Sequence, residues 1–433
     1  MIELIKNNKV VTTFLVVSFL LKLAFMPISV HSDIFAIESF PPLLLKEHVI
    51  DIFSYMDKKN LSYFYPPLTY YSFAFFEFVI HFFSDTFLAW MNGLRIADLN
   101  GLKGQAVDYI RAVPNPNMLK DLFLAKTPFL LFDIASIIVL LKFAKAKMIK
   151  SKSIILWVVN PVIIYTTYLF GQFDIIVLFF ILLGFFLIRR NTKLGMLSLG
   201  IAAAFKSYPF IIVLPTAIIF GANFKQRLKL IAVAALPFII SILPVLINNP
   251  QLLIFTFFPK NLFHYKGALE GWQKYSQLVK YGLLSLSYVL ILVLSAFLKL
   301  KDKLKTSTGI SLVVVLLALT LAGRTHFHYL IWEMPLLILW FRNNLKFLTI
   351  VILIQTISFA SYKILASQLQ LGLFAPLNPD YFGSLPTFNS QVNQIIPYRF
   401  ISTLGFIVFT FVNIYLILKI LTFLLFRAEV KKR

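Results

Sequence analysis

Residues 228–247 read LKLIAVAALPFIISILPVLI, an apolar run whose one charge, Lys229, lies at its start. A helix needs about 20 such residues to cross the hydrocarbon core of a membrane. Backbone polar groups in lipid must be bonded within the protein, so such a run is either a helix or a strand of a closed barrel. Because its apolar residues are continuous rather than alternating, this stretch predicts a membrane-spanning helix.

Blocks of the same kind recur along the whole chain. Hydrophobic residues make up 59% of its 433 positions and charged residues 14%, against about 45–50% and about 25% in soluble domains. We expect an all-α, polytopic transmembrane bundle of about 12 spans, with a range of about 10–13. The expected spans are 10–28, 124–142, 153–170, 174–188, 194–206, 208–221, 228–247, 277–298, 308–322, 329–341, 345–363 and 401–425.

Basic clusters between the blocks predict the orientation. Seven short segments hold 23 of the 41 Lys and Arg residues but 3 of the 18 acids. This is the asymmetry of cytoplasmic loops, so the net charge of +23 does not indicate a nucleic-acid partner. Both termini are then cytoplasmic, and we expect a plasma-membrane protein. The clusters are 1–9, 142–152, 189–193, 225–229, 299–305, 342–346 and 427–433.

This orientation makes residues 29–123 one large outer loop. The apolar segment Leu68–Phe83 within it is short and contains Glu77 and His81, so we expect a helix that lies in the membrane surface rather than one that crosses. A second outer loop covers 364–400. We predict a catalytic module over residues 1–345 and additional transmembrane helices over 346–433.

Polar residues collect at the predicted outer ends of the helices, in four separate loops. They are Asp33 in HSDIF, Gln172 and Asp174 in GQFD, Lys206 in AAAFKSYP, and Arg324, His326 and His328 in GRTHFHY. A carboxylate can take a proton from a hydroxyl group. Cations and histidines can stabilise a phosphate that departs with growing negative charge. The set therefore suits sugar transfer from a lipid phosphate, with the lipid tail held among apolar helices.

Each of these residues also has an ordinary structural interpretation. Asp33 could be a solvated loop acid, and Lys206 could extend to the headgroups of the outer leaflet. Lys22, near the outer end of the first span, is interpreted as a lysine of that extending kind. Asp133, inside the second span, is expected to pair with another helix.

The order of several short motifs resembles the GT-C glycosyltransferases. These motifs are an Asp soon after a short first span, YPPL at 65–68, Asn160–Pro161, GQFD at 171–174, GIAAAFKSYP at 200–209, and a late His-x-x-Tyr-x-x-x-x-x-Pro from His326 to Pro335. The similarity covers roughly residues 10–345. It is most similar to the polyprenol-phosphate-mannose-dependent mannosyltransferases, which include the GPI mannosyltransferase I type.

The resemblance implies an inverting transferase that moves mannose or another hexose from a polyprenyl-phosphate donor, at the outer face, to a lipid, glycan or protein acceptor. It implies Asp33 as general base and Asp174 as a second acid. Lys206 would contact the donor phosphate, together with the loop that carries Arg324, His326 and His328. Glu38, Tyr65 and Gln172 are expected in the acceptor or sugar loop.

Several alternatives stay open at this point. The family often has a pair of acids near the first motif of this loop, whereas His31–Ser32–Asp33 supplies a single carboxylate here. Glu38 or Asp51 therefore competes with Asp33 as the base. The sequence establishes no cofactor; two carboxylates would permit a divalent metal, but no ligand spacing demands one. The absence of cysteine excludes thiolate chemistry. A lipid or lipid-linked-sugar transporter is the alternative function, and an assembly subunit or glycan ligase is a third.

Overall fold

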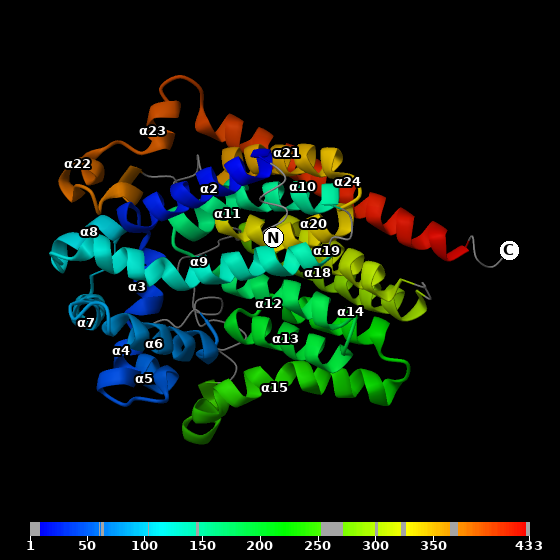
Figure 1. The fold of residues 1–433 in the computed structure, drawn as a ribbon, viewed down its shortest axis with the longest axis horizontal. Helices are drawn as coiled ribbons and strands as arrows, with labels where there is room; N and C mark the ends of the chain where they lie inside the picture. The colour runs from blue at the N-terminus through cyan, green and yellow to red at the C-terminus, as the bar shows by residue number, and fades with distance from the viewer. Residues whose placement is uncertain are drawn as a thin grey trace.

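The computed structural model describes residues 9–59, 61, 65–102, 104–143, 147–252, 272–298, 302–321, 326–363 and 371–429. These residues form helices, and no strand occurs among them. The longer helices lie side by side along the long axis of the molecule (Figure 1). The chain is therefore an all-α bundle, as its sequence predicts.

Within the described ranges, seven helices are long and apolar enough to cross a membrane. The bounds of these helices are α2 Lys9–Ile28, α9 Met118–Phe143, α15 Phe224–Asn248, α18 Trp272–Phe297, α19 Lys303–Leu321, α21 Leu345–Lys363 and α24 Tyr398–Glu429.

Shorter helices supply the rest of the bundle. They are α10 Lys147–Val158, α11 Pro161–Ile163, the π-helix η1 Ile164–Leu169, α12 Asp174–Leu187, α13 Thr192–Phe205, α14 Phe210–Phe220, η3 Phe327–Glu333 and α20 Met334–Phe341. The described residues of all twelve predicted spans therefore lie mainly in helices, while the number of helices that cross the membrane stays a prediction. Residues 206–209 separate two antiparallel helices, α13 and α14, rather than kinking one.

Both predicted outer loops fold into small helices at one end of the bundle (Figure 1). Val30 of the first loop donates its backbone N–H to Leu373 of the second at 2.8 Å. The small helices are α3 Ser32–Glu38, α4 Pro41–Lys46, α5 Ile52–Lys58, α6 Pro67–His81, α7 Phe87–Leu99, α8 Ala106–Ala112, η5 Leu371–Phe374, α22 Pro379–Ser384 and α23 Phe388–Val392; the short η2 covers Pro250–Leu252.

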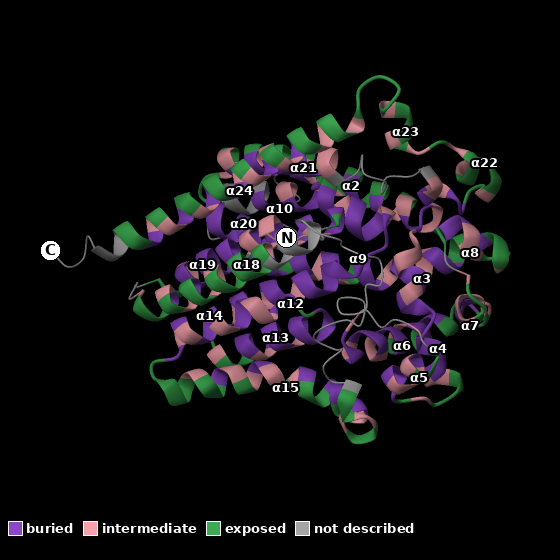
Figure 2. Ribbon diagram, turned by 180° about the vertical axis from the view of Figure 1, so that it is seen from behind, coloured by how far each residue is buried: buried purple, intermediate pink, exposed green. Residues whose placement is uncertain are grey.

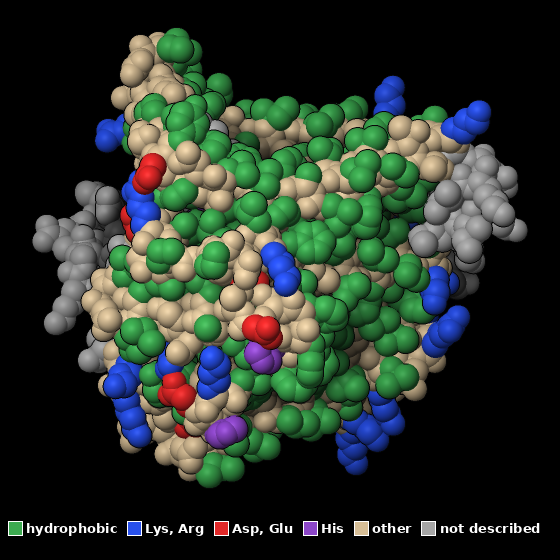
Figure 3. Space-filling view, turned by 60° about the vertical axis from the view of Figure 1, so that its left-hand side comes forward, with side chains coloured by type: hydrophobic (Ala, Val, Ile, Leu, Met, Phe, Trp, Pro, Cys, Tyr) green, Lys and Arg blue, Asp and Glu red, His purple; other side chains and the backbone are tan. Residues whose placement is uncertain are grey.

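The surface of the bundle has the character of a membrane protein. Helices α12, α19 and α20 are mostly buried, while α15, α18 and α24 turn one face outward (Figure 2). Large apolar side chains occupy those outward faces, for example Ile240, Leu290 and Phe411, each more than half exposed. A broad hydrophobic surface lies between charged side chains toward the two ends (Figure 3). The chain is an integral membrane protein, because water would not stabilise such a surface.

One interpretation from the sequence is wrong. Lys22 does not extend to the headgroups but is buried, and its Nζ lies 2.7 Å from Asp133 Oδ2 on α9. Trp157 and Tyr168 also donate to this carboxylate, each at 2.7 Å. The expected interhelix pairing of Asp133 is confirmed, and Lys22 is its partner because the packing of α2 against α9 encloses both groups.

Candidate active site

The turn between η1 and α12 contains GQFD and depends on Gly171. Its φ is +85°, a left-handed conformation that L side chains rarely adopt. A Cβ at this position would also lie 3.2 Å from Ile34 Cδ1. The tight turn places Gln172 and Asp174, both fully buried, at the end of the bundle that carries the small helices.

Asp174 begins α12 and holds Lys206, which follows the last residue of α13. Lys206 Nζ lies 3.0 Å from Oδ1 and 2.9 Å from Oδ2 of Asp174. The indole of Trp332 donates to Oδ1 at 2.8 Å. Both carboxylate oxygens are thus engaged, so Asp174 is suited to holding the Lys206 ammonium rather than to accepting a proton.

Aromatic rings surround the Lys206 ammonium. Its Nζ lies 5.3–5.7 Å from the ring centres of Tyr65, Phe173, Tyr329 and Trp332. Such distances allow cation–π attraction between the ammonium and the rings. The rings come from three separate parts of the chain, so tertiary packing creates this enclosure.

Asp33 lies in the first turn of α3, beside the same group of residues. Gln172 Nε2 donates a hydrogen bond to its Oδ2, and His31 Nδ1 lies 3.1 Å from its Oδ1. Burial alone would raise the pKa of Asp33. The nearby His31, His328 and His326 lower the pKa more strongly, and the net result is well below the usual range. The carboxylate therefore stays ionised at neutral pH, which is the form that a general base needs.

Tyr65 joins the two carboxylate centres. Burial raises the pKa of Tyr65 well above 10, and the charges of Asp33 and Asp174 act in the same direction. Its ring packs edge-on against Phe173 at 4.9 Å. The predicted residues Asp33, Tyr65, Gln172, Asp174 and Lys206 therefore do come together.

The late histidine loop reaches the same place. The rings of His326 and His328 stack with centres 5.3 Å apart, and Phe170 lies between His31, at 3.7 Å, and His328, at 5.4 Å. His328 is buried, and its Nδ1 has no hydrogen-bond partner among the described residues. Arg324, predicted to act beside these histidines, lies outside the described residues.

The competing acids of the first loop have other surroundings. Asp51 accepts the backbone N–H of Ser54 at 3.0 Å and caps α5, which is an ordinary structural role. Glu38 is buried, and its charge interacts with those of Lys126 and Glu77. Burial raises the pKa of Glu38 to about 8, although Lys126 opposes the change. Neither acid makes a hydrogen bond to the group around Asp33 in the described structure.

Sequence reasoning missed two residues of this region. Trp332 both bonds Asp174 and stacks on Tyr208 with ring centres 4.0 Å apart. Lys126 is fully buried in α9 and donates to the backbone carbonyls of Ser29 and Tyr168. A lysine inside an apolar span is a signal that would have identified Lys126, whereas a tryptophan in an apolar helix gives none.

The donor groups do not fit a resident metal ion. No group of three or more His, Cys, Asp or Glu side chains with suitable spacing lies within the described ranges. The Asp174 oxygens face an ammonium and an indole N–H rather than open space.

A model of glycosyltransferase family 87 matches residues 122–340 of this chain, whereas no curated protein matches it significantly. The matched segment runs from α9 through α20, so it contains Gln172, Asp174, Lys206 and the histidine loop. The first outer loop with Asp33 lies before it. Because the family consists of GT-C-type membrane enzymes, it supports the transferase interpretation and not the transporter. The match covers half of the chain, and the protein therefore belongs to glycosyltransferase family 87.

Proposed function

We propose that the protein transfers a hexose, such as mannose, from a polyprenyl-phosphate donor to a hydroxyl group of a lipid, glycan or protein acceptor. The observation that carries this proposal is the arrangement around Tyr65. The charge of the ionised Asp33 carboxylate acts on Tyr65, and the enclosed Lys206 ammonium lies 5.5 Å from the centre of the Tyr65 ring. A proton acceptor beside a cation is what attack on a sugar phosphate requires.

In the proposed step, the acceptor oxygen attacks the anomeric carbon while Asp33 takes the hydroxyl proton. The bond between the anomeric carbon and the phosphate oxygen breaks, and its electron pair leaves with the polyprenyl phosphate. Attack from the face opposite the leaving group inverts the anomeric configuration. We propose the step without a metal ion.

Lys206 stabilises the departing phosphate in this scheme. Its ammonium has three N–H bonds, and Asp174 offers two oxygen acceptors, so an N–H remains for a phosphate oxygen. Asp174 keeps the ammonium oriented, and the rings of Tyr65 and Tyr329 offer faces for a sugar. His326 and His328 add hydrogen-bonding groups beside Asp33.

The proposal places this chemistry on the non-cytoplasmic side of the plasma membrane. The support is the charge pattern: the basic turns lie at the opposite end of α12–α15 from Asp174 and Lys206. The cysteine-free chain allows a direct test with single cysteines. An impermeant maleimide should label Ser390→Cys in intact cells and leave Asn343→Cys unlabelled; the reverse pattern would place the site in the cytoplasm.

The activity is tested with purified protein, a panel of polyprenyl-phosphate sugars and acceptors, and detection of released polyprenyl phosphate. Asp33→Asn should lower the rate by about 10²-fold or more, whereas Asp51→Asn, which alters only a helix cap, should keep most of it. Equal rates for Asp33→Asn and wild type would refute the base assignment. A parallel assay with a chelator tests the metal-free step, which predicts an unchanged rate.

A further inference from the structure

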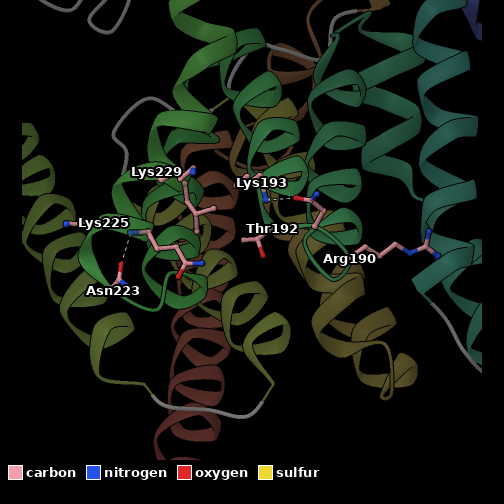
Figure 4. Close-up of a pocket in the computed structure, with 9 residues that line it drawn as sticks. Arg190, Thr192, Lys193, Asn223, Lys225 and Lys229 are labelled. Atoms are coloured by element: carbon pink, nitrogen blue, oxygen red, sulfur yellow. Dashed lines mark hydrogen bonds between the residues drawn. The ribbon is translucent and has the colours of Figure 1, made fainter.

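A basic pocket lies at the end of the bundle opposite Asp174 and Lys206. It occupies about 670 Å³ between the α12–α13 turn and the start of α15. Figure 4 shows Lys193, Thr192 and Lys229 near its middle, with Arg190 and Lys225 at opposite margins. We refer to it as the basic pocket; its lining residues are Arg190, Asn191, Thr192, Lys193, Asn223, Lys225, Gln226, Lys229 and Leu230.

Close helix packing builds the pocket. Gly200 of α13 lies so near α15 that a Cβ on it would be 2.0 Å from the carbonyl oxygen of Ala234. This contact brings α13 and α15 together, and their N-terminal ends, which begin at Thr192 and Phe224, lie at the same end of the bundle. The positive ends of two helix dipoles therefore add to the charge of the four cations.

Nothing in the pocket neutralises this charge. All nine lining residues are described, and none of them is acidic. The ion pairs of the described residues involve none of the four lining cations. Thr192 and Gln226 add neutral polar side chains. The side chains of Asn191 and Asn223 cap the two helix N-termini. Four cations around one cavity, beside two helix N-termini, are suited to a phosphate group.

The position of the pocket indicates which kind of molecule would bring the phosphate. Apolar, outward-facing residues of α15 continue directly from its rim, beginning with Leu228 and Leu236. A ligand that fills the pocket with its phosphate would thus lay an acyl chain along this face. Cytoplasmic loops are rich in Lys and Arg for orientation alone, but that role needs only charge near the helix ends. Here the four cations surround a cavity beside a lipid-facing helix. We propose that the basic pocket binds the phosphate headgroup of an anionic phospholipid.

The test measures lipid binding to purified protein in a neutral detergent by native mass spectrometry, with phosphatidylglycerol as probe and phosphatidylcholine as neutral comparison. Lys193→Gln/Lys229→Gln should weaken phosphatidylglycerol binding on the order of tenfold or more. The charge-conserving Lys193→Arg/Lys229→Arg should retain it. A matched control, Arg342→Gln/Lys346→Gln, removes two cations from the predicted cytoplasmic end outside the pocket and should bind as wild type does.

A parallel titration with inorganic phosphate separates the two sources of the ligand chemistry. Weak phosphate binding with strong phosphatidylglycerol binding supports the lipid headgroup. Equal occupancy by free phosphate and lipid, equal loss in the pocket and control variants, or no preference over phosphatidylcholine would each overturn the proposal. Because these residues lie far from Lys206, transferase activity is a separate readout that need not change.

Discussion

Lys206 and Asp174 form a buried ion pair in which the ammonium lies within 3.0 Å of both carboxylate oxygens. Each residue is adjacent to the end of a helix, Asp174 at the start of α12 and Lys206 just after α13. The antiparallel packing of these helices brings them together. The packing of α12 against α13 therefore positions the ammonium that the proposed departing phosphate needs.

Breaking this pair should destabilise the protein. Asp174→Asn leaves an ammonium without its counter-charge, which costs about 3–5 kcal/mol when both groups are buried. Removing both charges in Asp174→Asn/Lys206→Gln should cost less than the sum of the single changes. Thermal unfolding in detergent measures all three, and additive losses would contradict a direct pairing. Asp380→Asn is the control, because its pair with Arg111 is exposed and should matter by less than about 1 kcal/mol.

Gly171→Ala should lower both stability and activity. The residue has a left-handed φ and would contact Ile34, so the substitution should cost on the order of 1–2 kcal/mol. The displaced turn would also move Gln172 away from Asp33. Gly282→Ala is the matched control: a Cβ there meets nothing within 4 Å on a helix, so that variant should be neutral or slightly stabilised. Equal melting temperatures for Gly171→Ala and wild type would show that the turn tolerates a side chain.

Stability should depend on pH through Glu38. An unfolded glutamate has a pKa of about 4.3, whereas burial raises the pKa of folded Glu38 to about 8 despite Lys126. Between these values the folded protein retains a proton that the unfolded chain has lost, so stability falls as pH rises from about 4.3 to about 8. Glu38→Gln should reduce this loss, and its stability should exceed that of wild type most at pH 8. The exposed Asp85→Asn serves as control; an unchanged pH slope in Glu38→Gln would disprove the assignment.

Lys22→Met should lower the free energy of unfolding strongly, whereas replacing a lysine that extends to the headgroups would not. It leaves the Asp133 carboxylate without a cation inside the bundle, and the expected loss is about 3–5 kcal/mol. Lys9→Met, on the exposed start of the same helix, should have little effect. The comparison uses the melting temperature of each variant. Similar values for the two would mean that the Lys22–Asp133 pair contributes little to stability.

The choice of base in the first outer loop could not be made from the sequence. Asp33 and Glu38 belong to one short helix, and the sequence left the choice of base open between them. Five residues in an α-helix correspond to about 140° of rotation, so the two side chains leave the helix in different directions. Asp33 meets Gln172 and His31, while Glu38 lies near Lys126 and Glu77. Only the neighbours of α3 distinguish them.

The sequence by itself determined the helical bundle, because long apolar runs and basic clusters are local properties. They decide directly whether a segment enters the membrane as a helix and which way it is oriented. The sequence also indicated Asp33, Asp174 and Lys206 as candidate site residues, since polar groups beside apolar spans are conspicuous. Tertiary structure alone decided that Lys206 pairs with Asp174, that Trp332 and Tyr65 enclose it, and that Lys22 belongs to Asp133. Partnerships between distant segments depend on which helices pack together, and the spacing of residues along a single chain does not encode that directly.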